Sequence, residues 1–87
     1  MATYRIEWKA SALRELKGID RQVVPRIVAA VASLSDEPFP PGARKLQGTD
    51  HTYRIRVGDY RVLYEVHHAF VRILIVRVRH RKDAYRD

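Results

Sequence analysis

Residues 52–67 carry the pattern that most constrains the fold, because two alternating segments are separated by a loop of only two residues, Gly58-Asp59. Segments 52–57 and 60–67 are predicted strands, and a glycine in the first loop position favours a type II′ hairpin turn. This turn fixes the pairing of the two strands. The predicted pairs are Val57–Tyr60, Arg56–Arg61, Ile55–Val62, Arg54–Leu63 and Tyr53–Tyr64.

The same alternation divides the hairpin into two faces. One face is apolar and would meet the rest of the core. It carries Tyr53, Ile55, Val57, Tyr60, Val62 and Tyr64. The other face is polar and carries Arg54, Arg56, Arg61, Leu63 and Glu65.

The segments before the hairpin mostly follow helical spacing. Residues 4–8 alternate and predict an opening strand, whereas residues 10–17 predict a short helix. A second apolar stripe from Val23 to Leu34 predicts another helix. Asp20 could cap this second helix, but Pro25 is tolerated only in a first turn and so indicates a later start. The two segments together predict a helical hairpin.

The remaining segments complete the predicted sheet. After a loop at residues 36–42, residues 44–47 predict a short strand. The apolar, β-branched segment 70–78 predicts a buried central strand, followed by a polar tail at residues 80–87. The chain therefore predicts one domain over residues 1–87 with an α+β fold: an N-terminal strand, a two-helix hairpin, and then a mostly antiparallel twisted sheet with the helices packed on one face.

Positive charge is concentrated in the second half of the chain. The net charge is +7; residues 1–43 hold 6 basic and 5 acidic residues, and residues 44–87 hold 11 and 5. A concentrated positive field attracts polyanions, of which nucleic acid is favoured over an acidic membrane surface. The simpler alternative is a soluble domain with a high isoelectric point. A hydrophobic content of 46% excludes a disordered polyelectrolyte.

The polar face of the hairpin breaks a local rule of sheet stability. Like charges directly opposite each other destabilise a sheet, and Arg56 faces Arg61 with Arg54 two residues away. Such violations are expected at functional sites, and a bound phosphate would relieve the repulsion. The alternative is a solvated outer face on which Glu65 partly balances the arginines. Three arginines on one face favour the anion site.

The C-terminal segment adds a second basic group. His80, Arg81, Lys82 and Tyr85 follow the predicted central strand, whose end would lie beside the hairpin. RNA sites combine phosphate-binding arginine with an aromatic ring for stacking. A frayed basic terminus is the alternative reading of this segment taken alone.

The sequence gives little indication of metal, cofactor or disulfide sites. His67-His68 could bind a metal ion, but a solvated turn is favoured there, and His51 has no obvious partner. No cofactor or metal site is therefore predicted. The absence of cysteine excludes disulfides and thiolate sites. No secretion signal or membrane span is evident, so the cytoplasm is the expected compartment.

Two long segments carry a resemblance to a known family. LQGTDHTYRIRVGDYRVLYEV, followed by VRILIVRVRHRKDAY, resembles the RelE/ParE toxin superfamily, and the order of elements resembles it over essentially the whole chain. The ending HRKDAY resembles the RelE branch, whose nucleases have a basic residue, an arginine and a tyrosine there. ParE-like toxins, which poison DNA gyrase, generally lack that set.

The resemblance implies the toxin of a type II toxin–antitoxin system that enters the ribosomal A site and cuts messenger RNA. The 2′-hydroxyl of one nucleotide would attack the adjacent phosphate, leaving a 2′,3′-cyclic phosphate and a 5′-hydroxyl without a metal ion. The implied partners are the ribosome with its message and a small acidic RelB-like antitoxin, with no membrane involved. Two alternatives stay open: a ParE-like gyrase toxin without nuclease activity, and a catalytically silent domain that binds RNA or a partner.

The resemblance also implies residue roles. Arg54 and Arg56 occupy positions that are lysines in one RelE-like branch, and Arg61 matches a phosphate-stabilising arginine. Arg81 matches an arginine that stabilises or protonates the leaving group, and Tyr85 matches a tyrosine that stacks on the substrate base.

The arginines at the two lysine positions change the expected chemistry. Arginine stays protonated, so a lysine-type general base is absent. His80 is the hypothesised proton-transfer residue, since imidazole titrates near neutral pH. Arg79 and Lys82 are predicted, with Arg54 and Arg56, to bind the substrate.

Overall fold

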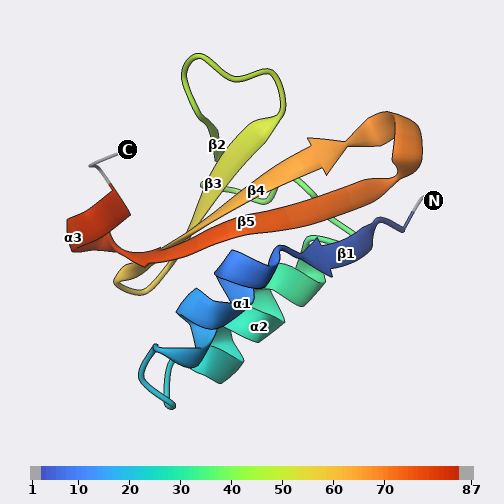
Figure 1. The fold of residues 1–87 in the computed structure, drawn as a ribbon. Helices are drawn as coiled ribbons and strands as arrows, with labels where there is room; N and C mark the ends of the chain where they lie inside the picture. The colour runs from blue at the N-terminus through green and yellow to red at the C-terminus, as the bar shows by residue number, and fades with distance from the viewer. Residues whose placement is uncertain (1–2, 85–87) are drawn as a thin grey trace.

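A computed structural model describes residues 3–84 of the chain as a five-stranded sheet with two helices on one of its faces (Figure 1). The elements in chain order are β1 (Arg5–Trp8), α1 (Ala10–Lys17), α2 (Val24–Ser33), β2 (Arg44–Lys45), β3 (Thr52–Val57), β4 (Tyr60–His67), the 3₁₀ turn η1 (His68–Phe70), β5 (Arg72–His80) and α3 (Arg81–Ala84). The α+β fold is as the sequence predicts. No helix among these residues is long and apolar enough to cross a membrane.

The strands lie in the order β1-β5-β4-β3-β2, so β5 is central, as its apolar sequence predicts. β1 pairs with β5 in parallel, and all other neighbours are antiparallel. The parallel pair is possible because α1 and α2 connect β1 to the rest of the sheet and return the chain across one face (Figure 1). The helical hairpin thereby buries its apolar stripe against the sheet.

The β3–β4 hairpin has the predicted register throughout. All five predicted pairs are present, and a sixth joins Thr52 to Glu65. Gly58 has a φ of +59°, a conformation that disfavours residues with a side chain, whereas Asp59 has a negative φ. This combination is that of a type II′ turn.

Several element boundaries differ from the sequence prediction. β5 begins at Arg72 rather than at residue 70, because Val71 has a left-handed backbone (φ 49°) that interrupts the strand and ends η1. The strand continues to His80, and α3 follows it in place of a polar tail. β2 covers only two residues of the predicted segment 44–47.

The start of α2 is later than Asp20, as Pro25 indicates. Val23 precedes the first helical residue, and Pro25 lies in the first turn, where its missing N–H costs nothing. Asp20 does not cap the helix. Its carboxylate instead accepts a hydrogen bond from the Gln22 N–H at 2.9 Å, in the turn between the two helices.

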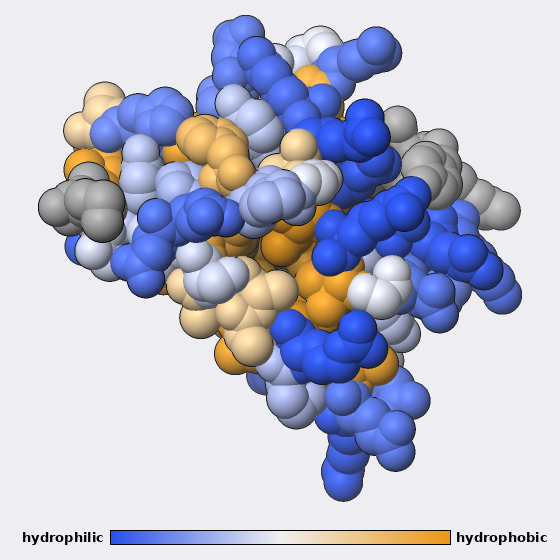
Figure 2. All heavy atoms as spheres, turned by 180° about the vertical axis from the view of Figure 1, so that it is seen from behind, coloured by the Kyte–Doolittle hydropathy of each residue, from blue (hydrophilic) through white to orange (hydrophobic). Residues whose placement is uncertain are grey.

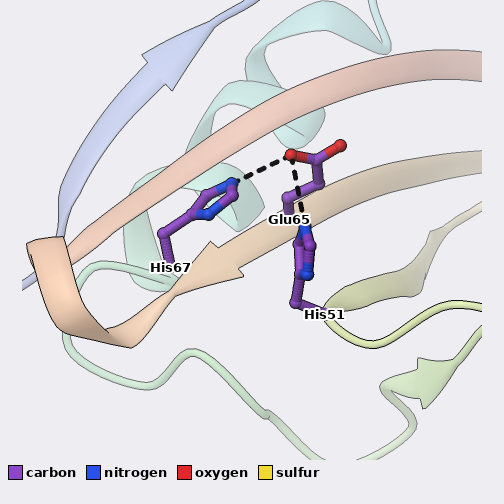
Figure 3. Close-up of side chains that lie close together, drawn as sticks. All are labelled: His51, Glu65 and His67. Carbon is purple, nitrogen blue, oxygen red and sulfur yellow. Dashed lines mark hydrogen bonds and ion pairs between the residues drawn. The ribbon is translucent and has the colours of Figure 1, made fainter.

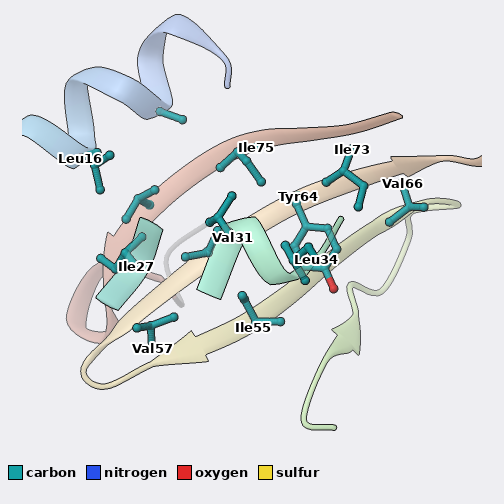
Figure 4. Packing of buried hydrophobic residues seen from close by; sticks show 13 residues of the cluster. Leu16, Ile27, Val31, Leu34, Ile55, Val57, Tyr64, Val66, Ile73 and Ile75 are labelled. Atoms are coloured by element: carbon teal, nitrogen blue, oxygen red, sulfur yellow. The ribbon is translucent and has the colours of Figure 1, made fainter. Parts of the chain in front are cut away.

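Tyr64 is the largest fully buried side chain of the core between the helices and the sheet (Figure 4). Its ring lies among Leu34, Val66 and Ile73 (Figure 4), while its hydroxyl donates a hydrogen bond to the carbonyl oxygen of Pro38 at 2.7 Å. This bond ties the 36–42 loop to the sheet. Burial, together with the nearby Tyr53, raises the pKa of Tyr64 to about 12.

Tyr64→Phe should lower the free energy of unfolding at neutral pH by about 1 kcal/mol, because the Pro38 carbonyl loses its partner. The raised pKa makes this gap depend on pH. Between about pH 10 and 12 the unfolded Tyr64 loses its proton while the folded one keeps it, so the wild type loses stability through this group as the pH rises, and the variant lacks that loss. Urea unfolding at pH 8 and at pH 11 measures the gap, which should narrow at the higher pH. A constant gap would contradict the assignment.

Candidate functional site: two arginine rows across the sheet

Arginines from four strands share the sheet face opposite α1 and α2. Cross-strand pairing aligns them in two rows, called here the arginine rows. The first row is Arg56–Arg61–Arg79, across β3, β4 and β5. The second row is Arg44–Arg54–Leu63–Arg77, across β2 to β5. Directly opposed side chains in a sheet lie within about 5.5 Å at Cβ, so each row concentrates positive charge. Figure 2 views the molecule from behind and shows strongly hydrophilic side chains gathered around a small apolar area.

A β-bulge in β5 makes the two rows possible. Leu63 pairs with Arg77 and Tyr64 pairs with Ile75, so Val76 has no partner on β4. The extra residue reverses the alternation, and Ile75 and Val78 both point into the core. Arg77 and Arg79 therefore share a face with Leu63 and Arg61. Without the bulge they would point toward the helices.

Arg61, in the middle of the first row, is only 4% exposed. Its Nη1 donates to the carbonyl oxygens of Tyr60 (3.2 Å) and Gly58 (3.5 Å), and its buried Nε has no hydrogen-bond partner. Within residues 3–84 no carboxylate forms an ion pair with it. A buried guanidinium between two further arginines is unfavourable for folding, and an anion placed beside it would offset that cost.

Arg79 is neutralised by a residue that is distant in the sequence. Its Nε lies 3.2 Å from Glu15 Oε2, while Glu15 Oε1 accepts the Val78 N–H at 2.9 Å. Beyond the end of β1 this edge of β5 has no strand partner, and Glu15 of α1 satisfies it. Arg79 thus lies beside Arg61, as the predicted substrate group requires, but already holds a counter-ion.

The start of α3 lies beside the hairpin turn, as the sequence predicts. The Arg81 N–H donates to the Asp59 carbonyl oxygen at 2.7 Å, and its Nε lies 3.9 Å from Asp59 Oδ1. Both side chains are more than half exposed, so this ion pair contributes little stability and leaves Arg81 available to another anion. Lys82 is exposed in the same turn. Tyr85 lies outside the described residues.

His80 is not brought together with the arginine rows. It pairs with Tyr60, whose ring it meets edge-on at 5.2 Å, and alternation places both on the face opposite Arg61 and Arg79. Its Nδ1 accepts the Lys82 N–H at 3.2 Å, which holds the first turn of α3. The geometry therefore does not support the hypothesis that His80 transfers a proton at this site.

Two features of the structure could not be predicted from the sequence. Glu15 is separated from Arg79 by 64 positions and has no local motif. His51, Glu65 and His67 form a compact group at the other end of β4 from the hairpin turn (Figure 3). Among residues 3–84 this is the group of carboxylate and imidazole side chains that could hold a metal ion, and it is separate from the arginine rows.

Arg61→Met should raise the free energy of unfolding, by about 1–2 kcal/mol, because it removes a buried unpaired charge and keeps most of the side-chain volume. Arg21→Met, at an exposed position between α1 and α2, is the matched control and should change it by less than about 0.5 kcal/mol. Urea unfolding at neutral pH measures both. A clear loss of stability in Arg61→Met would show that the arginine is structural.

Comparisons with known proteins agree with this fold. The sequence model of the family described as ParE toxin of type II toxin-antitoxin system, parDE, matches residues 6–85. Toxin RelG of Mycobacterium tuberculosis is 34% identical over 95% of this chain and 97% of its own length. Putative toxin RelE1 of Methanocaldococcus jannaschii is 26% identical over 97% of each.

Solved structures give the same result. The archaeal RelE-RelB complex from Pyrococcus horikoshii OT3 contains a chain with a TM-score of 0.82 and 31% identity, covering 94% of this chain and 99% of that one. The toxin-antitoxin complex RelBE2 from Mycobacterium tuberculosis gives 0.79 and 27%, covering 91% and 99%. The chain therefore belongs to the RelE/ParE superfamily and is a RelE-like toxin of a type II toxin–antitoxin system.

Proposed function

We propose that this toxin is an endoribonuclease that cuts messenger RNA in the ribosomal A site. The observation that carries the proposal is Arg61, a buried arginine that has no carboxylate partner among residues 3–84 and is set in a row between Arg56 and Arg79. Such a site is electrostatically incomplete, and a phosphodiester would complete it. The ribosome would deliver an exposed codon to this face, in the cytoplasm where translation takes place.

The proposed reaction begins when the 2′-hydroxyl of one nucleotide attacks the adjacent phosphorus. The 2′-hydroxyl gives its proton to water, the P–O bond to the 5′-oxygen of the next nucleotide breaks, and that oxygen takes a proton from water, leaving a 2′,3′-cyclic phosphate and a 5′-hydroxyl. Negative charge accumulates on the phosphate oxygens in the transition state. Arg56 and Arg61 would stabilise it, because fixed cationic donors in a partly desolvated site need no reorganisation. The exposed Arg81 would stabilise the leaving oxygen.

Other residues would bind and position the message. Arg54 and Lys82 would contact neighbouring phosphates, and Tyr85 would stack on a base. Arg54 and Arg56 remain charged, and His80 faces away. Catalysis would therefore rest on charge stabilisation and positioning more than on a strong general base.

Ribosome-dependent cleavage is the direct test. Primer extension on message in a translation extract should show codon-spaced cuts that require ribosomes. Arg61→Met and Arg81→Ala should each slow cleavage by at least about 100-fold, the usual effect of removing one transition-state donor. Arg21→Met should cleave at the wild-type rate. Equal cutting by all four proteins would refute the assignment of the arginines.

A gyrase-directed toxin is the second candidate, favoured by the ParE description of the family whose sequence model matches residues 6–85. Its predicted signature is stabilised gyrase–DNA breaks while the message stays intact. Both assays can be run on the same protein samples.

We also propose an acidic antitoxin as the partner, since the two similar solved structures contain RelE-RelB and RelBE2 complexes. With a net charge of +7 here, opposite charge on the partner should accelerate association. Stopped-flow mixing should show an association rate at least about tenfold lower in 0.5 M than in 0.05 M salt. A rate independent of salt would mean that apolar contacts direct binding. Co-purification from the native operon would supply the partner.

A further inference from the structure

His51, Glu65 and His67 converge at the end of β4 that is remote from the hairpin turn (Figure 3). His67 Nε2 lies 2.9 Å from Glu65 Oε1, and His51 Nε2 lies 3.8 Å from the same oxygen. The potential ligand atoms of the three side chains all lie within 4.8 Å of one another, and the two imidazole ring centres are 4.7 Å apart.

Strand pairing, rather than chance side-chain placement, brings these residues together. Glu65 and His67 are two positions apart on β4 and so share a face. His51 immediately precedes β3, and its carbonyl oxygen accepts the Val66 N–H at 2.9 Å. The backbone that carries His51 is therefore fixed against β4. The pairing of β3 with β4 therefore sets the backbone positions of all three residues.

Hydrogen bonding alone does not account for this arrangement. The Glu65–His67 contact is a good hydrogen bond, but the 3.8 Å between His51 and Glu65 is too long for one and is an ion pair only while the imidazole is protonated. His51 nevertheless turns its Nε2 toward the carboxylate instead of outward. A shared central ligand would explain why three polar groups point to one place.

We propose that His51, Glu65 and His67 bind a divalent transition-metal ion, with Zn²⁺ the best fit. Two imidazole nitrogens and one carboxylate oxygen suit zinc and its neighbours, whereas Ca²⁺ and Mg²⁺ require mostly oxygen ligands. In a tetrahedral site with bonds near 2.1 Å, ligand atoms lie about 3.4 Å apart. The observed spacings differ from that value by about 1.4 Å at most, a change that side-chain rotation can supply. Water would take the fourth position.

The metal would act as a clamp, not as a catalyst of RNA cleavage. It would join the segment that precedes β3 to the end of β4, at the open end of the hairpin. Glu65 and Arg61 are four positions apart along β4, about 13 Å of strand, so the ion would not touch the phosphate proposed to lie at the arginine rows. The site is accessible from solvent, because the His51 side chain is 48% exposed. This inference does not depend on the proposed nuclease activity.

Calorimetric titration of the chelator-treated full-length protein with ZnCl₂ tests the site. The wild type should bind one Zn²⁺ with micromolar affinity, and His51→Gln and Glu65→Gln should each bind at least about 10-fold more weakly. His68→Gln is the matched control, because His68 is adjacent in sequence but its Nδ1 bonds the Tyr4 hydroxyl instead. It should bind like the wild type. Zn²⁺ should also raise the unfolding midpoint of the wild type and the control only.

Failure of the wild type to bind Zn²⁺ below about 1 mM would end the proposal. So would equal affinity in His51→Gln, which alters an exposed residue outside the strands and can be checked for folding by circular dichroism. Equal loss in His68→Gln would point to unspecific coordination by neighbouring histidines. Should Glu65→Gln fail to fold, His51→Gln decides alone.

Discussion

The two-residue turn at Gly58-Asp59 fixes the register on which the rest of the molecule depends. Because side chains alternate along a strand, a shift of one residue would exchange the two faces of the hairpin. The Tyr64 hydroxyl could then no longer reach the Pro38 carbonyl, and Arg61 would point into the core. The positive φ of Gly58 is therefore a requirement of both the core and the arginine rows. The backbone conformation of Gly58 thus determines which side chains of the hairpin enter the core and which ones lie on the face proposed to bind RNA.

The two faces of the sheet serve different purposes. Under α1 and α2 the sheet buries apolar side chains, including Tyr64 and Ile73 with no exposed surface. That burial offsets the unfavourable burial of Arg61 on the opposite face, where no carboxylate of the described residues acts as its counter-ion. Small domains have modest stability, so an unfavourable group of this kind is expected only where it has a use. Glu15 neutralises Arg79 at the sheet edge, whereas no carboxylate of residues 3–84 forms an ion pair with Arg61 in the middle of the row.

Sequence reasoning predicted the hairpin register completely, because turn length and alternation are local properties. It also placed the second helix late, since Pro25 restricts its own neighbourhood. Sequence reasoning could not predict features that depend on contacts between residues distant in the sequence, or on an interruption of the two-residue alternation along a strand. The Val76 bulge is visible only as an uneven spacing of Ile73, Ile75 and Val78. The face of His80 could not be predicted for a related reason, because it depends on a register that runs through that bulge; the proton-transfer role of His80 stays a prediction. The proximity of His51 to Glu65 and His67 results from the pairing of β3 with β4, and no local sequence motif indicates it.

The same alternation along β4 produces two different polar sites on one face. Arg61 lies near the turn, and Glu65 and His67 lie near the other end, with Leu63 between them. Near the turn, cross-strand neighbours are all cationic, and an anion is the ligand that lowers the electrostatic energy. Near the other end, imidazole nitrogens and one carboxylate face each other. There a cation is the ligand that lowers the electrostatic energy. β4 thus carries a site that favours an anion at Arg61 and a site that favours a cation at Glu65, about 13 Å apart along the strand. A ligand at either end could be bound or lost while the apolar face keeps the fold unchanged.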